Sequence, residues 1–317
     1  MNSPIEHHDE NCIELFCHEC SAEFTIEHEL GLDYIPHFCT FCGEEIYREE
    51  EVILSNEPNI VIYSVFCRKY RNKIMNDPLF QIPIKKKPDV KYIFTTGENV
   101  YSQKQADVNL TFNYGKRWNN IRVPFWFIHY ISEGSSGGNM GNFQIKDIDI
   151  MKSKKNEGKK FCCFVYRHNV TYRNKFVQSL KKYKRIDCPG GAMHNMNGLK
   201  VKDKIKFQKN YRFSIAYENS QRNGYTTEKI LDAYKSGCIP IYWGSKTIKT
   251  DFNSETFINS NDFKTEKELI EYIKKVDNDE ELYNSYFNKP IFSKTWIHNL
   301  SDVKKIYKKI VNKIIET

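Results

Sequence analysis

The second half of this 317-residue chain alternates short apolar runs with amphipathic segments, and that alternation limits the folds available to it. The apolar runs predict strands at 161–166, 211–219 and 238–244, and the amphipathic segments predict helices at 173–183, 226–237 and 265–279. In the first of these helices, Phe176, Val177 and Leu180 fall on one face. Strands that alternate with helices favour parallel sheets built from βαβ units, so the predicted fold class is α/β.

The first half also contains apolar runs between polar breaks, and these predict further strands at 59–66, 90–99, 106–115 and 121–128. A Gly- and Ser-rich segment, Ser132–Asn142, then predicts a flexible loop or a hinge between domains. A chain of this length is long enough for two domains and a small additional module.

The net charge of +8 suits an anionic ligand such as nucleic acid, lipid or a phosphorylated small molecule. Scattered lysines are equally typical of a solvated surface, so charge alone does not choose between these. No stretch reaches the roughly 20 apolar residues of a membrane span, and the acidic, polar start does not have the pattern of a signal peptide. The sequence therefore predicts a cytoplasmic protein whose cysteines stay reduced.

Two cysteine pairs near the start, Cys17 with Cys20 and Cys39 with Cys42, have the CxxC spacing of a zinc knuckle. Together they would give one ion four thiolate ligands, whereas the alternative is four buried free thiols. A four-thiolate site has no open coordination position, so the predicted zinc is structural rather than catalytic. The surrounding segment is rich in Glu, which argues against nucleic-acid binding.

The segment from Tyr217 to Gly244, YENSQRNGYTTEKILDAYKSGCIPIYWG, carries a dense group of polar residues between a strand and a helix. This loop follows the carboxyl end of a predicted parallel strand, where α/β proteins bind ligands. The helix is predicted to begin near Thr227, and its free N–H groups favour a phosphate. Lys229 in the first turn is electrostatically unfavourable, and a bound anion would explain it. Glu228 taken alone fits equally well as a partner of the helix dipole.

This segment resembles the donor-site signature of the α-1,3/1,4-fucosyltransferases, in which ENS, Y-x-TEK, G-x-x-P-I/V and a closing Gly follow one another. The segments FTTGEN, IRVPFWF and FVYRHNVTYRNKFVQSL resemble further family segments in the same order. The resemblance covers roughly residues 57–286. It implies a GT-B architecture with two Rossmann-like domains facing a cleft, GDP-fucose held by the C-terminal domain, and no catalytic metal.

The domain plan combines this resemblance with the cysteine pattern. Family members usually begin with a strand-helix unit, and here the cysteine module takes that place, so the N-terminal Rossmann-like domain is expected to be abbreviated. The expected divisions are a zinc-ribbon-like module at 1–51, an acceptor-side domain at 52–145, a GDP-fucose-binding domain at 146–290 and a C-terminal amphipathic helix at 291–317.

The resemblance also implies roles for individual residues. Glu98 is the general base that would deprotonate the acceptor hydroxyl. The donor-binding residues are Arg173, Asn219, Tyr225, Glu228 and Lys229. A diphosphate leaving group needs positive charge, which the guanidinium fork of Arg173 and the ammonium of Lys229 can supply. Tyr225 would donate to a phosphate or position the sugar, Glu228 would accept from sugar hydroxyls, and Asn219 would orient both.

The predicted function is therefore inverting, metal-independent α-1,3-fucosyl transfer from GDP-fucose to a hydroxyl of a glycan acceptor. One alternative is a glycosyltransferase that uses another nucleotide sugar, such as GDP-mannose. A second is a catalytically inactive zinc-ribbon binding protein, which the complete set of polar donor-site residues argues against. No nucleic-acid partner is expected. The terminal helix carries Val303, Ile306, Ile310 and Ile314 on one face and is predicted to pack on the domain, with peripheral membrane contact as the alternative.

Overall fold

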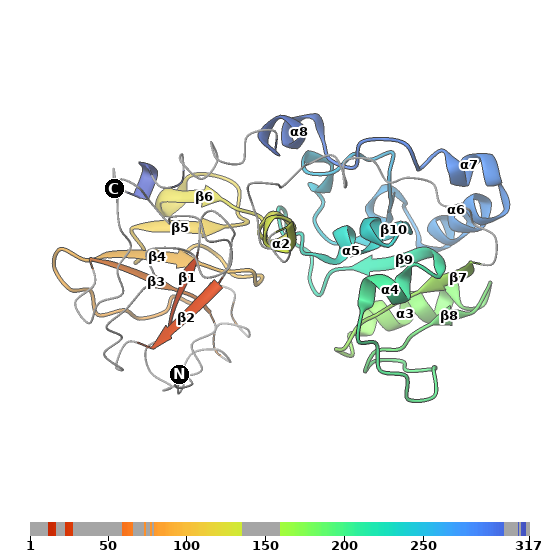
Figure 1. Cartoon of the computed structure of the whole chain (residues 1–317), viewed down its shortest axis with the longest axis horizontal. Coiled ribbons are helices and arrows are strands. Elements are labelled where there is room, and N and C mark those ends of the chain that lie inside the picture. Colours follow the sequence, from red (N-terminus) through yellow and green to blue (C-terminus); the bar gives the residue numbers. More distant parts are fainter. Residues whose placement is uncertain are drawn as a thin grey trace. The chain divides into compact units, whose positions relative to one another are not determined.

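The computed structural model divides the chain into two compact units, Gln144–Ser301 and Met1–Phe143 with Asp302–Thr317 (Figure 1). The described residues are 12–16, 23–27, 59–65, 73, 77, 79–134, 159–300, 310 and 312–314. Within them, no helix is both long enough and apolar enough to cross a bilayer.

The second unit contains a parallel sheet with the strand order β11-β10-β9-β7-β8. Its strands are β7 (Lys160–Cys163), β8 (Ile186–Asp187), β9 (Tyr211–Tyr217), β10 (Ile239–Trp243) and β11 (Ile258–Asn259). Because β7 lies between β8 and β9, the direction of strand addition reverses between β7 and β9. In sheets of this type, ligands bind outside the carboxyl ends of the strands at that reversal.

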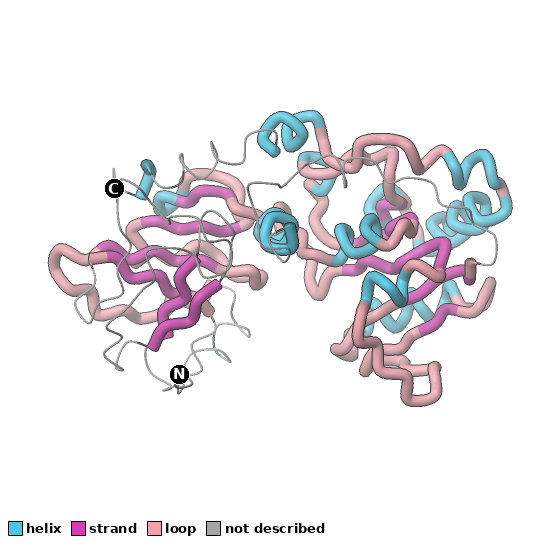
Figure 2. The backbone as a smooth tube through the Cα atoms, in the orientation of Figure 1, coloured by secondary structure: helices cyan, strands magenta, loops and turns pink. Residues whose placement is uncertain are grey.

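The helices of the second unit follow the predicted alternation (Figure 2). They are α3 (Thr171–Leu180), α4 (Lys204–Gln208), α5 (Lys229–Lys235), α6 (Glu266–Asn278), α7 (Glu280–Asn284) and α8 (Lys294–Leu300), with short 3-10 turns at Ile248–Thr250 and Ser260–Asp262. The buried face of α3 contains Phe176, Val177 and Leu180, as the sequence predicted. Helix α5 packs against β9 and β10 and is followed by Gly237 at φ 69°, a left-handed position that suits glycine after a helix.

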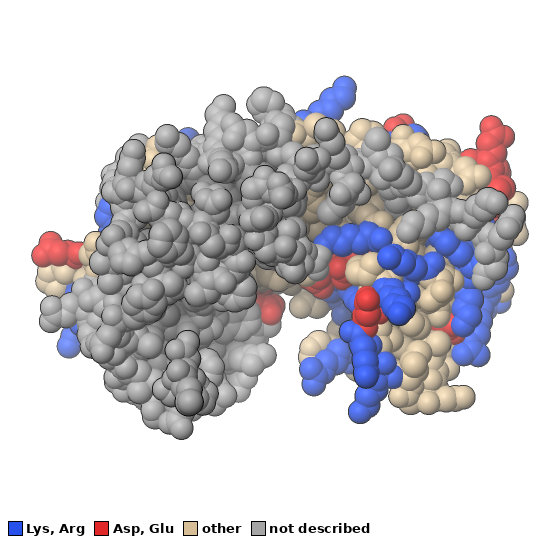
Figure 3. Space-filling model, in the orientation of Figure 1, with Lys and Arg blue, Asp and Glu red and all other residues tan. Residues whose placement is uncertain are grey.

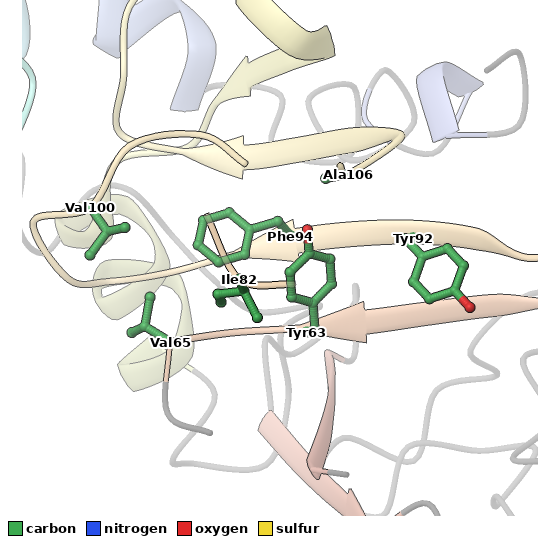
Figure 4. Packing of buried hydrophobic residues seen from close by; sticks show 7 residues of the cluster. All are labelled: Tyr63, Val65, Ile82, Tyr92, Phe94, Val100 and Ala106. Carbon is green, nitrogen blue, oxygen red and sulfur yellow. The ribbon is translucent and has the colours of Figure 1, made fainter. Parts of the chain in front are cut away.

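The first unit contains a second parallel sheet with the strand order β3-β4-β5-β6. Its strands are β3 (Ile60–Tyr63), β4 (Lys91–Thr95), β5 (Val108–Thr111) and β6 (Asn120–Arg122). A separate antiparallel pair is formed by β1 (Cys12–Phe16) and β2 (Glu23–Glu27). Figure 4 shows the apolar cluster beside β3 and β4, made of Tyr63, Val65, Ile82, Tyr92, Phe94, Val100 and Ala106. Both units are therefore built on parallel sheets, and the α/β prediction is confirmed.

One predicted strand was wrong in its second half. The run at 121–128 continues β6 only to Arg122, and α2 (Phe125–Gly134) begins directly after Pro124. Proline suits this place because its fixed φ is compatible with a helix start and its missing N–H is not needed there. Trp126, Phe127 and Tyr130 are buried at helical spacing, so a continuous apolar run concealed a change from strand to helix.

Candidate donor site and the Glu98 loop

Arg173 links the carboxyl ends of β7 and β9, the place where the strand order reverses. It lies in the first turn of α3, which follows β7, and only 3% of its surface is exposed. Its Nε donates to the main-chain oxygen of Glu218 at 3.1 Å, and its Nη2 donates to that of Tyr217 at 2.7 Å. The Tyr172 hydroxyl also donates to the Glu218 oxygen. Arg173 therefore holds the end of β9, and its guanidinium has further N–H donors beyond these two bonds.

The Glu218 side chain closes the loop between β9 and α5. Glu218 is fully buried, at 0% exposure, and its backbone N–H donates to the main-chain oxygen of Trp243 at 2.8 Å. One carboxylate oxygen accepts from the backbone N–H of Thr227 and the other from the Thr227 hydroxyl, both at 2.8 Å. The carboxylate thus bridges the end of β9 to Thr227, two residues before α5 begins.

Lys229 points its ammonium group at internal carboxylates. Its Nζ lies 3.3 Å from Glu218 Oε2 and 3.2 Å from Glu228 Oε1, and it donates to the Thr227 hydroxyl at 2.7 Å. Burial acts to lower the pKa of Lys229, but the negative charges of Glu218 and Glu228 outweigh it and raise the pKa above its ordinary value. The sequence predicted that a bound anion accounts for a lysine here, whereas the structure supplies the anions from the chain itself. The helix also begins later than predicted, at Lys229 instead of near Thr227.

Glu228 immediately precedes α5 and remains partly accessible, with 26% of its side chain exposed. Burial acts to raise the pKa of Glu228, but the charges of Lys229 and Lys204 lower it to about 2. The carboxylate is therefore ionised at neutral pH and can accept hydrogen bonds from hydroxyl groups.

The other two predicted donor residues lie in the loop between β9 and α5. Asn219 is exposed and accepts a hydrogen bond from the Ser220 hydroxyl at 3.1 Å. Tyr225 is buried, with 2% exposure, next to Gly224 at φ 84°. The Gly224 N–H donates to the hydroxyl oxygen of Ser245, at 2.9 Å, in the segment after β10. The loop is therefore fixed at both ends, and of these two predicted donor residues Asn219 is the exposed one.

Glu98 belongs to the first unit and follows the carboxyl end of β4. It is half-buried, and its backbone N–H donates to the Thr96 hydroxyl at 3.0 Å. A side chain at the preceding Gly97 would place its Cβ 2.3 Å from the ring of Phe125 in α2, so only glycine allows this close packing. Among the described residues, no hydrogen-bond or ion-pair partner contacts the Glu98 carboxylate.

The four predicted zinc ligands, Cys17, Cys20, Cys39 and Cys42, lie outside the described residues. In the part of the chain that the structure does describe, no group of His, Cys, Asp and Glu is arranged to hold a metal ion. The cysteines of the second unit are buried free thiols, and burial raises the pKa of Cys238 to about 11. Such thiols are poor nucleophiles.

Sequence reasoning selected the residues expected to touch the donor and assigned no role to the residues that hold them in place. Glu218 and Thr227 belong to the same quoted segment but were given no role, and Tyr172 precedes the selected arginine. The closing Gly244 has a steric function, because a Cβ there would lie 2.6 Å from Glu218 Cγ and 2.6 Å from the Tyr242 hydroxyl oxygen. The available signal was a glutamate at the end of a buried strand, where an unpaired charge is costly.

Comparison with known proteins finds relatives of the segment that holds this site. Residues 152–308 match the family model described as glycosyltransferase family 10 (fucosyltransferase) C-term. The chain is 30% identical over 263 residues to the α-(1,3)-fucosyltransferase FucT of Helicobacter pylori, covering 68% of this chain and 53% of that protein. It is 36% identical over 146 residues to α-(1,3)-fucosyltransferase B of Drosophila melanogaster, covering 40% of this chain and 33% of that protein. The chain thus spans about half, or less, of the length of these relatives.

Solved structures agree with the sequence relatives. A crystal structure of an α1,3-fucosyltransferase matches with a TM-score of 0.62 and 26% identity, over 82% of this chain and 78% of that one. A second, determined with GDP-fucose, matches with a TM-score of 0.55 and 27% identity, over 70% and 76% of the two chains. The site at the ends of β7 and β9 therefore lies inside the segment that matches the glycosyltransferase family 10 model.

Proposed function

We propose that this protein transfers L-fucose from GDP-fucose to a hydroxyl group of a glycan or glycoconjugate acceptor, with inversion, forming an α-1,3 linkage. The observation that carries the proposal is the group of Arg173, Glu228 and Lys229 beside the β7–β9 reversal, inside the segment that matches the family 10 model. The comparisons favour fucosyl transfer over GDP-mannose use and over an inactive zinc-ribbon binding protein.

Donor binding is proposed for Arg173, Asn219, Tyr225, Glu228 and Lys229. The diphosphate would take N–H donors that Arg173 keeps beyond its two carbonyl bonds, together with the Lys229 ammonium. Ionised Glu228 would accept from hydroxyls of the ribose or the fucose. Exposed Asn219 would orient either sugar.

The charges of this site are balanced before any donor arrives. Arg173 and Lys229 each carry one positive charge, and Glu218 and Glu228 each carry one negative charge, so the four sum to zero. Recognition of a diphosphate by this set would rely on aimed N–H donors more than on net positive charge. Lys246, exposed in the segment after β10, is the proposed additional cation.

Glu98 is the proposed general base. Its carboxylate would accept the proton of the acceptor hydroxyl while the oxygen attacks the anomeric carbon of fucose, and GDP would leave with the bonding electrons. The carboxylate is half-buried and accepts no hydrogen bond from the described residues, which supports a role in contacting the acceptor hydroxyl. The GT-B arrangement, with an abbreviated acceptor-side domain facing the donor domain across a cleft, belongs to this proposal.

A structural zinc ion held by Cys17, Cys20, Cys39 and Cys42 is also proposed. The first cysteine pair lies, in sequence, between β1 and β2, which pair antiparallel with Phe16 opposite Glu23. Two thiolates in the connection of one such pair, completed by a second CxxC, make a donor set that suits tetrahedral zinc.

Calorimetry with GDP, UDP and ADP, each in the presence of EDTA, tests the donor proposal. Selective binding of GDP is expected, and a protein that binds none of the three would refute it. Labelled GDP-fucose and labelled GDP-mannose, each offered with a panel of glycan acceptors, then separate the two sugars. Transfer of mannose instead of fucose would replace the proposed function with its alternative.

A further inference from the structure

We infer that Glu218 is a positioning residue for donor binding: its buried carboxylate, through Thr227, fixes the Lys229 ammonium in the place where it meets the donor diphosphate. This inference rests on the proposed function, because it assigns Lys229 to the diphosphate. It concerns a residue to which neither the family comparison nor the sequence motif gave a role.

Glu218 cannot act on a substrate directly, because no part of it reaches the surface. Both carboxylate oxygens are also occupied, one by the backbone N–H and one by the hydroxyl of Thr227, at 2.8 Å each. Any effect of this residue on a ligand must therefore pass through a neighbour. Lys229 is that neighbour, since its Nζ lies 3.3 Å from Glu218 Oε2 and its side chain is 23% exposed.

The contact continues from Glu218 to Lys229 through one hydroxyl group. The Thr227 Oγ1 donates to Glu218 Oε2 and accepts from Lys229 Nζ at 2.7 Å. A lysine side chain is flexible and costs rotamer entropy when it is fixed. Because the Glu218 carboxylate and the Thr227 hydroxyl order the Lys229 side chain during folding, that entropy is lost before a ligand binds.

The fold reserves space for the Glu218 side chain. Gly244, directly after β10, lies so close that a Cβ there would be 2.6 Å from Glu218 Cγ. The main chain of Glu218 is held separately by Arg173, Tyr172 and Trp243, so the backbone is fixed independently of the carboxylate. Replacing only the carboxylate therefore tests its charge without removing the anchors of the strand end.

The charges around Lys229 make the inference measurable by pH. The groups that face Lys229 are Glu218 from the end of β9, Glu228 before α5, and Arg173 and Tyr172 from α3. Burial acts to lower the pKa of Lys229, and the charges of Glu218 and Glu228 raise it above its ordinary value. Without the Glu218 charge, Glu228 alone of the two glutamates opposes burial and Arg173, so the pKa of Lys229 is expected to fall.

The experiment measures GDP affinity of the full chain by calorimetry from about pH 7 to about pH 10, for wild type, Glu218→Gln and Glu218→Asp. GDP titrates equally with every protein, so its contribution cancels in the ratio of variant to wild-type affinity. Glu218→Gln is expected to bind GDP about tenfold more weakly near neutral pH, and its affinity should decline further at a lower pH than that of wild type. Glu218→Asp retains the charge and should restore the wild-type pH profile in part.

Asp232→Asn is the matched control, because Asp232 is another buried carboxylate of this region and is ion-paired to Lys204 in α4. It should lower stability and leave the pH profile of GDP affinity unchanged. If it moves the profile as far as Glu218→Gln does, the effect is general destabilisation of α5 and the inference is overturned.

Three further outcomes separate the two proposals. If wild type binds GDP and Glu218→Gln keeps its affinity and pH profile, the positioning inference fails while the donor proposal stands. If wild type does not bind GDP, the donor proposal itself fails. If Glu218→Gln does not fold, Thr227→Val decides, because it removes the linking hydroxyl and keeps both charges; unchanged GDP affinity in that variant overturns the inference.

Discussion

Two glutamates follow the carboxyl ends of parallel strands, one in each unit, and their surroundings differ completely. Glu218, after β9, is fully buried, accepts two hydrogen bonds from Thr227 and faces Lys229. Glu98, after β4, is half-buried, and its carboxylate has no hydrogen-bond or ion-pair partner among the described residues. The same residue type at the same kind of strand end can therefore hold a structure together or remain available for chemistry.

The difference bears on which carboxylate is available to a substrate. The Glu218 carboxylate is already engaged by two hydrogen bonds from Thr227 and by the Lys229 ammonium. The Glu98 carboxylate accepts no hydrogen bond from the residues that the structure describes. Burial and hydrogen-bond partners, which the motif letters do not contain, thus separate a positioning glutamate from a candidate base.

Substitution of Glu98 is the most direct test of the difference between the two glutamates. Glu98→Gln should lower the turnover of fucosyl transfer by a factor of about 10² to 10⁴, the usual contribution of a general base. GDP affinity should stay at the wild-type value, because the proposed donor residues belong to the other unit. Steady-state kinetics with a glycan acceptor, together with calorimetry, separate the two effects.

Retained turnover in Glu98→Gln would end the assignment of the base and, with it, the functional half of the comparison. A combined loss of turnover and of GDP affinity would instead assign Glu98 to donor binding. Glu98→Asp is the matched control for charge, since it keeps the carboxylate and moves it by about one methylene.

Lys229→Met tests how much the buried Glu218 carboxylate depends on its ammonium partner. The substitution leaves the Glu218 carboxylate buried beside Thr227 without its ammonium partner. Breaking one partner out of a buried pair costs about 3 kcal/mol or more, so the free energy of unfolding of the second unit should fall by that order. Urea denaturation followed by far-UV circular dichroism measures it, and GDP affinity should fall in the same variant.

The double variant Lys229→Met/Glu218→Gln distinguishes an unpaired charge from lost packing. It should recover part of the stability, because neither partner then leaves an uncompensated charge in the interior. A double variant as unstable as the sum of the two single variants would show that the two residues are energetically independent, contrary to the contact at 3.3 Å.

Much of the second unit could be predicted from the sequence because its signals are local. The period of buried residues in α3 and the left-handed Gly237 after α5 are visible in the letters alone. Runs of apolar residues do not distinguish a strand from a buried helix, and the segment around Trp126 failed for that reason.

The partners of the predicted site residues could not be derived from the sequence. Motif spacing placed Lys229 near an anion, but it could not show that Glu218, eleven positions earlier, supplies that anion. Arg173 was expected on phosphate oxygens, and two of its N–H groups donate to the carbonyl oxygens of Tyr217 and Glu218 at the end of β9. Such contacts depend on how strands and helices meet in space, and a single sequence does not record that.

Lysine distribution gives a related example. Exposed lysines such as Lys200, Lys202, Lys206 and Lys209 lie around α4 and do not touch the donor residues through any described contact. Figure 3 shows Lys and Arg gathered over the face of the second unit that this view presents. The net charge of the chain therefore reports largely on its surface, and the chemistry of the buried cluster depends on a few paired groups.

Gly97→Ala sharpens the comparison on the Glu98 side with a smaller expected effect. An alanine Cβ would lie 2.3 Å from the Phe125 ring, so the loop or the ring must shift. Overpacking of this kind costs about 1–3 kcal/mol, and a displaced Glu98 should lower turnover while GDP affinity is unchanged. Thermal denaturation and steady-state kinetics provide the two measurements.

Gly97→Ala/Phe125→Leu is the matched rescue, since the smaller side chain in α2 makes room for the added methyl group. Recovery of turnover in the double variant would show that Gly97→Ala lowers turnover by displacing Glu98. Failure to recover, with restored stability, would indicate that Gly97 serves the active site through its backbone rather than through packing.

Metal removal should have the smallest effect on the donor side. If Cys17, Cys20, Cys39 and Cys42 hold zinc, the purified protein carries about one ion per chain, and a Cys17→Ser/Cys42→Ser variant loses it. The proposed donor residues lie in Gln144–Ser301, whereas the cysteines belong to the other unit, so GDP affinity should change by no more than about twofold on chelation. Elemental analysis and calorimetry on the same sample test both statements. A large fall in GDP affinity after chelation would mean that the first unit contributes to donor binding, and the two glutamates could then no longer be treated as belonging to independent sites.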